Sequence, residues 1–221
     1  MREFFLLIQE TGVGAVFIVG LVAVLTGLIL AFVGSVQLKQ FGAEIYVADL
    51  VGVSMFREMG SLMTAIIMAG RSGAAFAAHI GSMKANEEID ALTTLGIEPH
   101  GYLVLPRVIA LTLMMPLLSL YAAFLGVIGG GVISNATLGI SWSQYIVEMQ
   151  TIVNMTEIGI GVGKSVVFAI LVAMSGCFSG MRSGTDAAAV GRATTDAVVN
   201  AIVLIVIADS IFAVVFSLLG I

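Results

Sequence analysis

Long apolar stretches alternate with short polar segments along this chain. Residues 11–38 carry no charged side chain, and at about 1.5 Å of rise per residue they can cross the roughly 30 Å hydrocarbon core of a membrane. We therefore predict a first membrane-spanning helix at about 13–36. The next apolar stretch, about 45–83, predicts a second, long span whose ends are less sharply marked. Four charged residues interrupt it: Asp49, Arg57, Glu58 and Arg71.

The segment 84–107 differs from its surroundings, because seven of its residues are charged or histidine. Such a segment cannot lie in lipid and is predicted to be an aqueous loop. A third span is expected at about 108–133, since Gly129–Gly131 and the polar residues after them are typical of an exit from the membrane. Polar connections at 134–157 and 182–196 then leave two further spans, predicted at about 158–181 and 197–221.

These elements predict an all-α integral membrane protein with about five transmembrane helices, organised as one domain over residues 1–221. The composition agrees, because 59% of the residues are hydrophobic, only 10% are charged, and the mean hydropathy is +1.12. A soluble domain needs roughly 25% charged residues to cover its surface. Soluble enzymes and DNA-binding proteins are therefore excluded.

The distribution of lysine and arginine predicts the orientation, since these residues are retained on the cytoplasmic side. With the N-terminus inside, six cationic residues lie in the cytoplasm and only Lys39 lies opposite. The six are Arg2, Arg71, Lys84, Arg107, Arg182 and Arg192. We thus expect a cytoplasmic N-terminus and a C-terminus outside.

Within the first polar loop, residues 87–95 are predicted to form a short cytoplasmic helix between spans two and three. Asn86 is a suitable N-cap, and Gly96 with Pro99 stops the helix. Acidic residues favour its N-terminal end, while three apolar residues form a ridge on one side. The acidic residues are Glu87, Glu88 and Asp90, and the ridge consists of Ile89, Leu92 and Leu95. This pattern suits insertion into a groove of a partner protein, although an ordinary solvated helix fits it as well.

Arg57 and Glu58 are candidate functional residues, because charges inside a membrane span are costly unless they are paired or hydrated. Arg57 is suited to binding a phosphate headgroup, with Glu58 balancing its charge. An interhelical ion pair or an interfacial location is the alternative explanation. Lys164 and Asp209 are further ionisable residues within predicted spans, and the sequence assigns no partner to either.

Three methionines follow the same part of span two at helical spacing: Met55, Met59 and Met63. A flexible apolar stripe of this kind would suit a cavity for variable acyl chains. Core packing explains the same spacing, so both interpretations stay open.

Two motifs that suggest catalysis do not meet its requirements. Gly163-Lys164-Ser165 lacks the first glycine of a phosphate-binding loop, since position 158 is isoleucine. Ser72 lies in a G-x-S-G sequence, but His79 would be about 10 Å away on the same helix, too far for a catalytic dyad. The glycines and alanines around Ser72 are instead typical of close helix packing. With Cys177 as the single cysteine, no internal disulfide, cysteine-based metal site or cofactor is expected in this chain.

Six sequence blocks taken together resemble the MlaE/YrbE permease family of ABC lipid transporters. They are Arg57-Glu58, 69–73, 87–92, 96–99, 102–107 and 190–195 together with 197–199. The chain differs from the usual family pattern at two places: it has His79 where a glutamate is usual and Gly60-Ser61 where a Gly-Pro pair is usual.

The resemblance implies a non-catalytic permease subunit that moves phospholipid or a related lipid between the bacterial inner membrane and a periplasmic carrier. It also implies a homodimer, a separate ATPase subunit that binds the ATP, an MCE-domain carrier outside and sometimes a STAS-domain protein inside. In such a system the loop helix at 87–95 would couple the permease to the ATPase, and the transport would serve outer membrane lipid asymmetry.

An ion-coupled secondary transporter or channel is the alternative function. It would use four intramembrane charges: Arg57, Glu58, Lys164 and Asp209. The predicted helix at 87–95 argues against it, since a self-sufficient carrier has no need of a coupling element.

Overall fold

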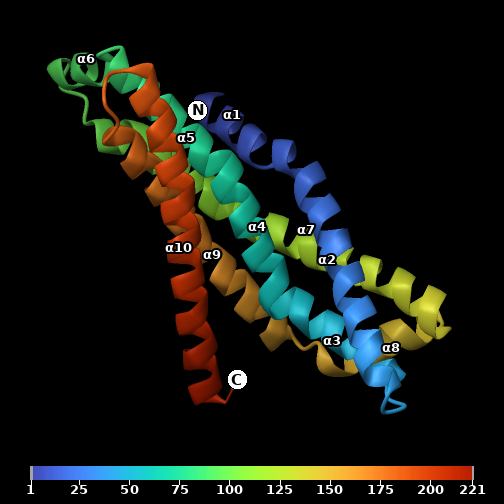
Figure 1. Cartoon of the computed structure of the whole chain (residues 1–221). Helices are drawn as coiled ribbons and strands as arrows, with labels where there is room; N and C mark the ends of the chain where they lie inside the picture. The colour runs from blue at the N-terminus through green and yellow to red at the C-terminus, as the bar shows by residue number, and fades with distance from the viewer. Residues whose placement is uncertain (1, 221) are drawn as a thin grey trace. The chain divides into compact units, whose positions relative to one another are not determined.

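The computed structural model describes residues 2–220, with side chains from residue 7 onward. This part of the chain is helical and contains no strand (Figure 1). The α-helices are α1 (Arg2–Thr11), α2 (Val13–Lys39), α3 (Val47–Val53), α4 (Gly60–Met68), α5 (Ala74–Ala85), α6 (Glu88–Thr94), α7 (Leu105–Leu138), α8 (Trp142–Ile152), α9 (Met155–Met181) and α10 (Ala187–Leu219).

Five helical stretches of the described residues are long and apolar enough to cross a membrane. They are Leu7–Lys39, Glu44–Ala85, His100–Leu138, Met155–Met181 and Ala187–Leu219. The predicted fold class, an all-α membrane protein with about five spans, is therefore confirmed.

The end predicted for span three is wrong, because α7 continues through Gly129–Gly131 to Leu138. These glycines lie within the helix and pack closely against neighbouring residues. A Cβ at Gly131 would lie 2.5 Å from the Trp142 ring, and one at Gly130 would lie 2.7 Å from Val51. A glycine destabilises a helix only slightly, and its missing side chain allows neighbouring helices to approach closely.

Span two is one continuous helical stretch with two π-helical segments, Ser54–Met59 and Ala69–Gly73. A third, His100–Val104, precedes α7. Such π-helical turns are uncommon and occur frequently at functional sites. Arg57, Glu58 and Arg71 all lie within the two π-helical segments of span two.

The described chain divides into two compact units rather than a single cluster of contacts. The first comprises residues 1–15, 65–115 and 166–221, and the second comprises 16–64 and 116–165. Because the boundaries fall inside α2, α4, α7 and α9, these four helices contribute residues to both units.

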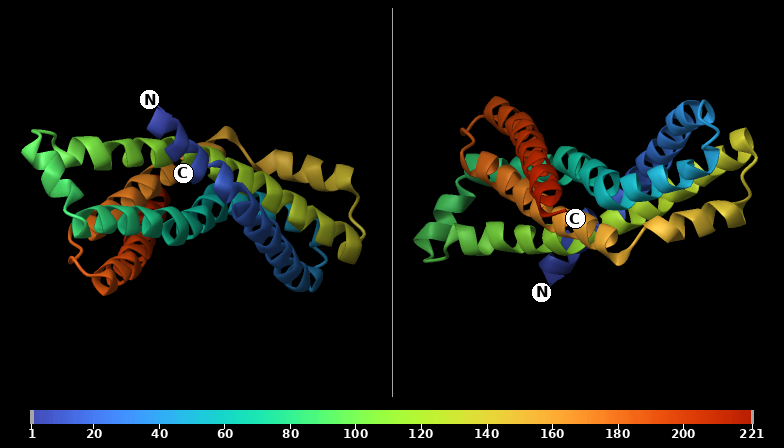
Figure 2. Two further views of the ribbon diagram at one scale, coloured as in Figure 1. Left: turned by 90° about the horizontal axis from the view of Figure 1, so that it is seen from above. Right: turned by 90° about the horizontal axis from the view of Figure 1, so that it is seen from below.

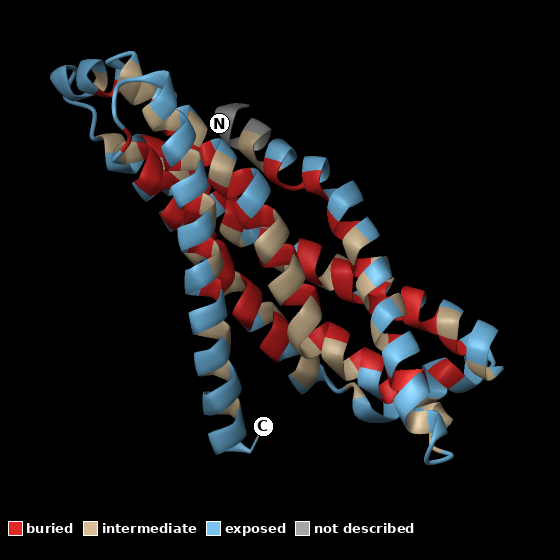
Figure 3. Ribbon diagram, viewed as in Figure 1, coloured by how far each residue is buried: buried red, intermediate tan, exposed pale blue. Residues whose placement is uncertain are grey.

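In the first unit, close approach of small residues packs the helices together. A Cβ at Gly176 of α9 would lie 2.6 Å from the carbonyl oxygen of Gly73, so position 176 has no room for a larger residue. Four residues of α10 form its buried stripe at intervals of four: Ala193, Ala197, Ala201 and Ile205. Most other residues of α10 are exposed (Figure 3). The short α6 lies beyond the ends of α5 and α7, which it connects (Figure 2).

The second unit has a core of apolar side chains that come mainly from α2, α3, the π-helical segment Ser54–Met59, α7 and α8. Met55, Phe56 and Tyr145 are its largest members, and the Phe56 ring meets Phe124 edge to face at 5.3 Å between centroids. Gly27 of α2 lies directly against the backbone of Gly126 in α7, where no larger residue fits.

Candidate functional site

Two ion pairs in the second unit connect span two to α9. The Arg57 guanidinium donates from Nη1 to both carboxylate oxygens of Glu157, at 3.1 and 3.0 Å. The Lys164 ammonium donates to Oε2 of Glu58. Arg57 and Glu58 are adjacent in the π-helical segment, whereas Glu157 and Lys164 are seven residues apart on α9. Seven residues are nearly two helical turns, so these partners share one face of α9.

The two pairs differ in burial. Lys164 has a fully buried side chain, and Glu58 is 29% exposed. Arg57 and Glu157 are 22% and 19% exposed. A buried ammonium is strongly destabilising without a carboxylate close by, so the Glu58 contact accounts for the presence of a lysine inside a span.

Arg57 and Glu58 are adjacent in the sequence, but each forms an ion pair with a residue of α9 rather than with the other. These contacts are the interhelical ion pairs that the alternative interpretation describes. A role toward lipid for either residue stays a prediction. Glu157 was missed from the sequence, although its two-turn spacing from Lys164 was a usable signal.

The three methionines do not share one environment. Met55 is 1% exposed and packs in the core of the second unit, against the position of Gly126. Core packing therefore explains Met55, and its candidacy as a lipid contact does not fit this structure. Met59 and Met63 are half-buried. The π-helical turn between Met55 and Met59 changes their relative directions, because it widens the helix.

The loop helix is present as α6, Glu88–Thr94, but it begins differently from the prediction. Glu87, with φ of 60°, is the N-cap residue and makes no side-chain capping bond. Asn86, predicted as the cap, donates instead to Glu88. That prediction is wrong because the chain enters the helix through a left-handed residue, one position later. Gly96, with φ of 77°, ends the segment as expected.

The predicted apolar ridge of α6 is only partly exposed. Ile89 is buried, Leu92 is half-buried and Leu95 is 75% exposed. The acidic residues Glu87, Glu88 and Asp90 are all exposed. Ile89 therefore anchors α6 to its own chain, and the surface left for a partner is acidic with Leu95 at its end.

A buried arginine organises the start of α7 in the first unit. Arg107 is 7% exposed, lies 5.9 Å from the centre of the Phe76 ring and donates to the carbonyl of Leu103. Its Nη2 is 3.1 Å from Nδ1 of His79. This contact links α7 to α5. Asp209, also in this unit, is half-buried on α10.

The serine motif of span two has no catalytic geometry. Ser72 is buried, and no hydrogen bond joins it to His79 among the described residues. The neighbouring Arg71 donates to the carbonyl of Glu10 at 2.7 Å, which ties the π-helical segment to the N-terminal region. Gly73 makes the close contact with α9 that the small-residue interpretation predicts.

Tyr145 connects α8 to the core of the second unit. Its side chain is 1% exposed, and its hydroxyl donates to the carbonyl of Val127 at 3.2 Å. Burial raises the pKa of the Tyr145 phenol, so the hydroxyl stays protonated and remains a donor.

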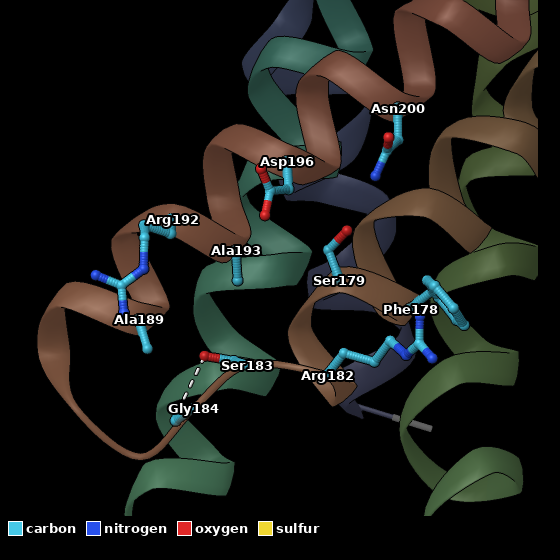
Figure 4. Close-up of a pocket in the computed structure, with 10 residues that line it drawn as sticks. All are labelled: Phe178, Ser179, Arg182, Ser183, Gly184, Ala189, Arg192, Ala193, Asp196 and Asn200. Atoms are coloured by element: carbon cyan, nitrogen blue, oxygen red, sulfur yellow. Dashed lines mark hydrogen bonds between the residues drawn. The ribbon is translucent and has the colours of Figure 1, made fainter.

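A pocket of about 370 Å³ lies in the first unit where α9 ends and α10 begins (Figure 4). Its lining is mainly polar and includes two arginines, Arg182 and Arg192, and one acid, Asp196. None of these residues was a candidate from the sequence, although Arg192 lies within the 190–195 block.

Comparison with known proteins places the chain among permeases. A family profile described as Permease MlaE matches residues 4–215. A probable ABC transporter permease protein of Rickettsia typhi is 38% identical over 192 residues, covering 87% of this chain and 74% of that protein.

Two relatives have more specific names. The intermembrane phospholipid transport system permease protein MlaE of Haemophilus influenzae is 32% identical over 214 residues, covering 95% of this chain and 82% of that protein. The chloroplastic protein TRIGALACTOSYLDIACYLGLYCEROL 1 of Arabidopsis thaliana is 34% identical over 173 residues, covering 78% and 49%. None of these three names describes an ion-coupled carrier, so the alternative function gains no support.

Proposed function

Because this chain belongs to the MlaE permease family, we propose that it is the membrane-spanning subunit of an ABC transporter that moves phospholipid. The observation that carries the proposal is the family match over residues 4–215, which includes all but the end of the five-span helical region. The Haemophilus influenzae relative is named for phospholipid transport. ATP hydrolysis belongs to a separate ATPase subunit, and this chain supplies the lipid route.

The lipid route passes the charged residues of span two. Arg57 is the candidate headgroup ligand, because its guanidinium is partly exposed and its present partner is a carboxylate that a lipid phosphate could replace. Glu58 is held by the buried Lys164 and keeps the local charge balanced. Met59 and Met63, both half-buried, are the remaining candidates for acyl-chain contact.

The ATPase binds the α6 segment. Glu87, Glu88 and Asp90 are exposed there, and Leu95 adds an apolar side chain that the chain itself leaves uncovered. A partner that covers Leu95 would bury this apolar side chain, and a cationic partner surface would complement the three carboxylates.

The orientation of the proposed assembly follows the cationic residues. The N-terminus and α6 lie in the cytoplasm of a bacterium and the C-terminus outside, with the inner membrane as the site of action. Two copies of the chain form the permease, with an MCE-domain carrier outside and, in some systems, a STAS-domain protein inside.

Small residues of α2 and α10 that could allow two copies of the chain to approach closely are used within the chain. Gly20 lies against Tyr121, Gly27 lies against Gly126, and Ala201 is buried. We therefore propose that the dimer uses another surface, and the exposed aliphatic side of α10 is one candidate. Val203, Ile207 and Val214 belong to it.

The coupling role of α6 is tested by reversing charge at Glu88 and Asp90. The double variant Glu88→Lys, Asp90→Lys should lose the ATPase on affinity purification, because two exposed carboxylates of the contact become cations. Glu44→Lys is the matched control, since Glu44 is an acidic residue outside α6. A double variant that retains the ATPase, with ATP hydrolysis still stimulated by phospholipid, would refute this assignment.

A further inference from the structure

We propose that His79 of α5 makes the attachment of α6 to the ATPase sensitive to pH. A neutral His79 accepts a hydrogen bond from Arg107, whereas a protonated His79 turns to Glu88 of α6 and withdraws this carboxylate from the ATPase. This regulation rests on the proposed function, because it acts on the surface that docks the ATPase. His79, Glu88 and Arg107 all belong to the first unit.

The contact with Arg107 determines the state of the His79 ring. Nη2 of Arg107 lies 3.1 Å from Nδ1 of His79. A guanidinium has donors only, so Nδ1 is the acceptor and the ring proton lies on Nε2. His79 is therefore neutral while this contact exists. A second proton, on Nδ1, would remove the acceptor and place two cations in contact.

Arg107 is held in place more firmly than His79. The arginine is 7% exposed, donates to the carbonyl of Leu103 and lies over the Phe76 ring. Its guanidinium stays charged at any physiological pH, so leaving this place would cost these contacts without relieving the repulsion by deprotonation. His79 is exposed. On protonation, the histidine is therefore the residue that moves.

Two carboxylates act electrostatically on the His79 ring, Glu88 of α6 and Glu10 of α1. Both are exposed. Glu10 already has a cation beside it, since the guanidinium of Arg71 donates to its backbone carbonyl at 2.7 Å. Glu88 accepts from the neutral amide of Asn86 at 3.2 Å. Because an imidazolium binds a carboxylate more strongly than a neutral amide does, Glu88 is the better partner for a protonated His79.

The side of α5 that packs against α9 and α10 carries small and apolar residues. Gly180 of α9 approaches Ala77, and Val190 approaches Gly81 at the start of α10. His79 is two residues from both Ala77 and Gly81, which is about 200° around an α-helix. The ring therefore points away from α9 and α10, and its charged neighbours come from α1, α6 and α7.

Protons from the aqueous side reach His79, because it lies at the α6 end of span two. This span, Glu44–Ala85, has 42 residues, or about 63 Å of helix, about twice the thickness of the hydrocarbon core. Lys84 follows five residues after His79, and its ammonium donates to the carbonyl of Met181. A lysine at this level indicates the aqueous end of the helix.

Binding of the purified ATPase to the permease in lipid nanodiscs tests the proposal. The dissociation constant is measured at about pH 8 and about pH 5, on either side of the ordinary histidine titration near 6.5. His79→Asn keeps an acceptor near the Nδ1 position but does not titrate in this range. As the pH falls, the wild-type dissociation constant should rise about threefold more than that of His79→Asn, the effect of losing one exposed charge contact.

His100→Asn is the matched control, because His100 is the other of the two histidines and is also exposed. This variant should follow the pH dependence of the wild type. An equal change of the dissociation constant in the wild type and in His79→Asn would overturn the proposal.

Nitrogen NMR of the histidine side chains in the wild-type chain gives a second test, which does not depend on how well His79→Asn folds. At about pH 8, Nδ1 of His79 should carry no proton, and a proton on that atom would overturn the proposal. Phospholipid-stimulated ATP hydrolysis by the wild type is measured in parallel. A permease that binds the ATPase with the expected pH dependence but shows no such stimulation would contradict the proposed function alone.

Discussion

The ion pair between Glu58 and Lys164 should be the more important of the two for stability. Replacing Glu58 with glutamine withdraws the carboxylate from a lysine whose side chain is fully buried. Breaking a buried pair by removing one partner destabilises by about 3–5 kcal/mol. Because Glu58 itself is 29% exposed, water compensates in part, and we expect about 3 kcal/mol.

The neighbouring pair provides an internal comparison. Glu157→Gln removes the carboxylate of a pair that is about one-fifth exposed on both sides, so water can hydrate Arg57 and the loss should be about 1 kcal/mol. The double variant Glu58→Gln, Lys164→Met removes both charges of the buried pair. It should recover at least half of the stability that Glu58→Gln loses, since no charge then remains buried.

Denaturant unfolding of the purified chain in mixed micelles, followed by circular dichroism, measures these differences. The expected order of stability is wild type, then Glu157→Gln, then Glu58→Gln, with the double variant above Glu58→Gln. A loss for Glu157→Gln equal to or greater than that for Glu58→Gln would refute the argument from burial. A double variant less stable than Glu58→Gln would refute the pairing itself.

Three further predictions concern packing, pH and lipid contact. Gly27→Val should prevent folding or destabilise the chain by more than about 3 kcal/mol in a thermal unfolding assay, because the valine side chain would overlap the Gly126 backbone. Gly159→Val is the control and should be tolerated, since nothing lies within 4 Å of a Cβ at that position. Equal losses of stability in the two variants would contradict the packing argument. The folding stability should fall as the pH rises above about 10, the pKa of a tyrosine phenol in the unfolded chain. The pKa of Tyr145 is raised in the folded chain, which therefore holds this proton more tightly than the unfolded chain does. Tyr145→Phe should reduce the dependence of stability on pH, and an unchanged dependence between pH 9 and pH 11 would contradict this prediction. A photoreactive amino acid at Met59 should capture phospholipid, while one at the buried Met55 should capture only protein, and the reverse result would exclude the proposed route.

Much of the fold was predictable because the physical constraint is simple. A span requires about twenty apolar residues with satisfied backbone hydrogen bonds, and the charge-free run of residues 11–38 meets it clearly. Gly129–Gly131 misled, since a glycine run can indicate either an exit or a close helix contact. Only the position of Val51 and Trp142 against these glycines distinguishes the two.

The candidate site was predictable only in part. Arg57 and Glu58 are recognisable because ionisable residues within a span need partners, but the identity of those partners depends on how α9 packs against the π-helical segment. Sequence spacing does not indicate a π-helical turn. The methionine stripe was predicted for a regular α-helix, whereas Met55 and Met59 lie in a π-helical segment. The pocket near Arg182 and Asp196 depends on the register of α9 and α10, which one sequence does not reveal.

The central claim is that this chain carries phospholipid for an ATP-driven transporter. The most direct measurement reconstitutes the permease with its ATPase in vesicles that contain fluorescent phospholipid, and follows lipid transfer to an external acceptor carrier with and without ATP. The account predicts transfer that requires ATP and is lost in Glu88→Lys, Asp90→Lys. Transfer at the same rate without ATP, or transfer driven by an imposed ion gradient alone, would contradict it.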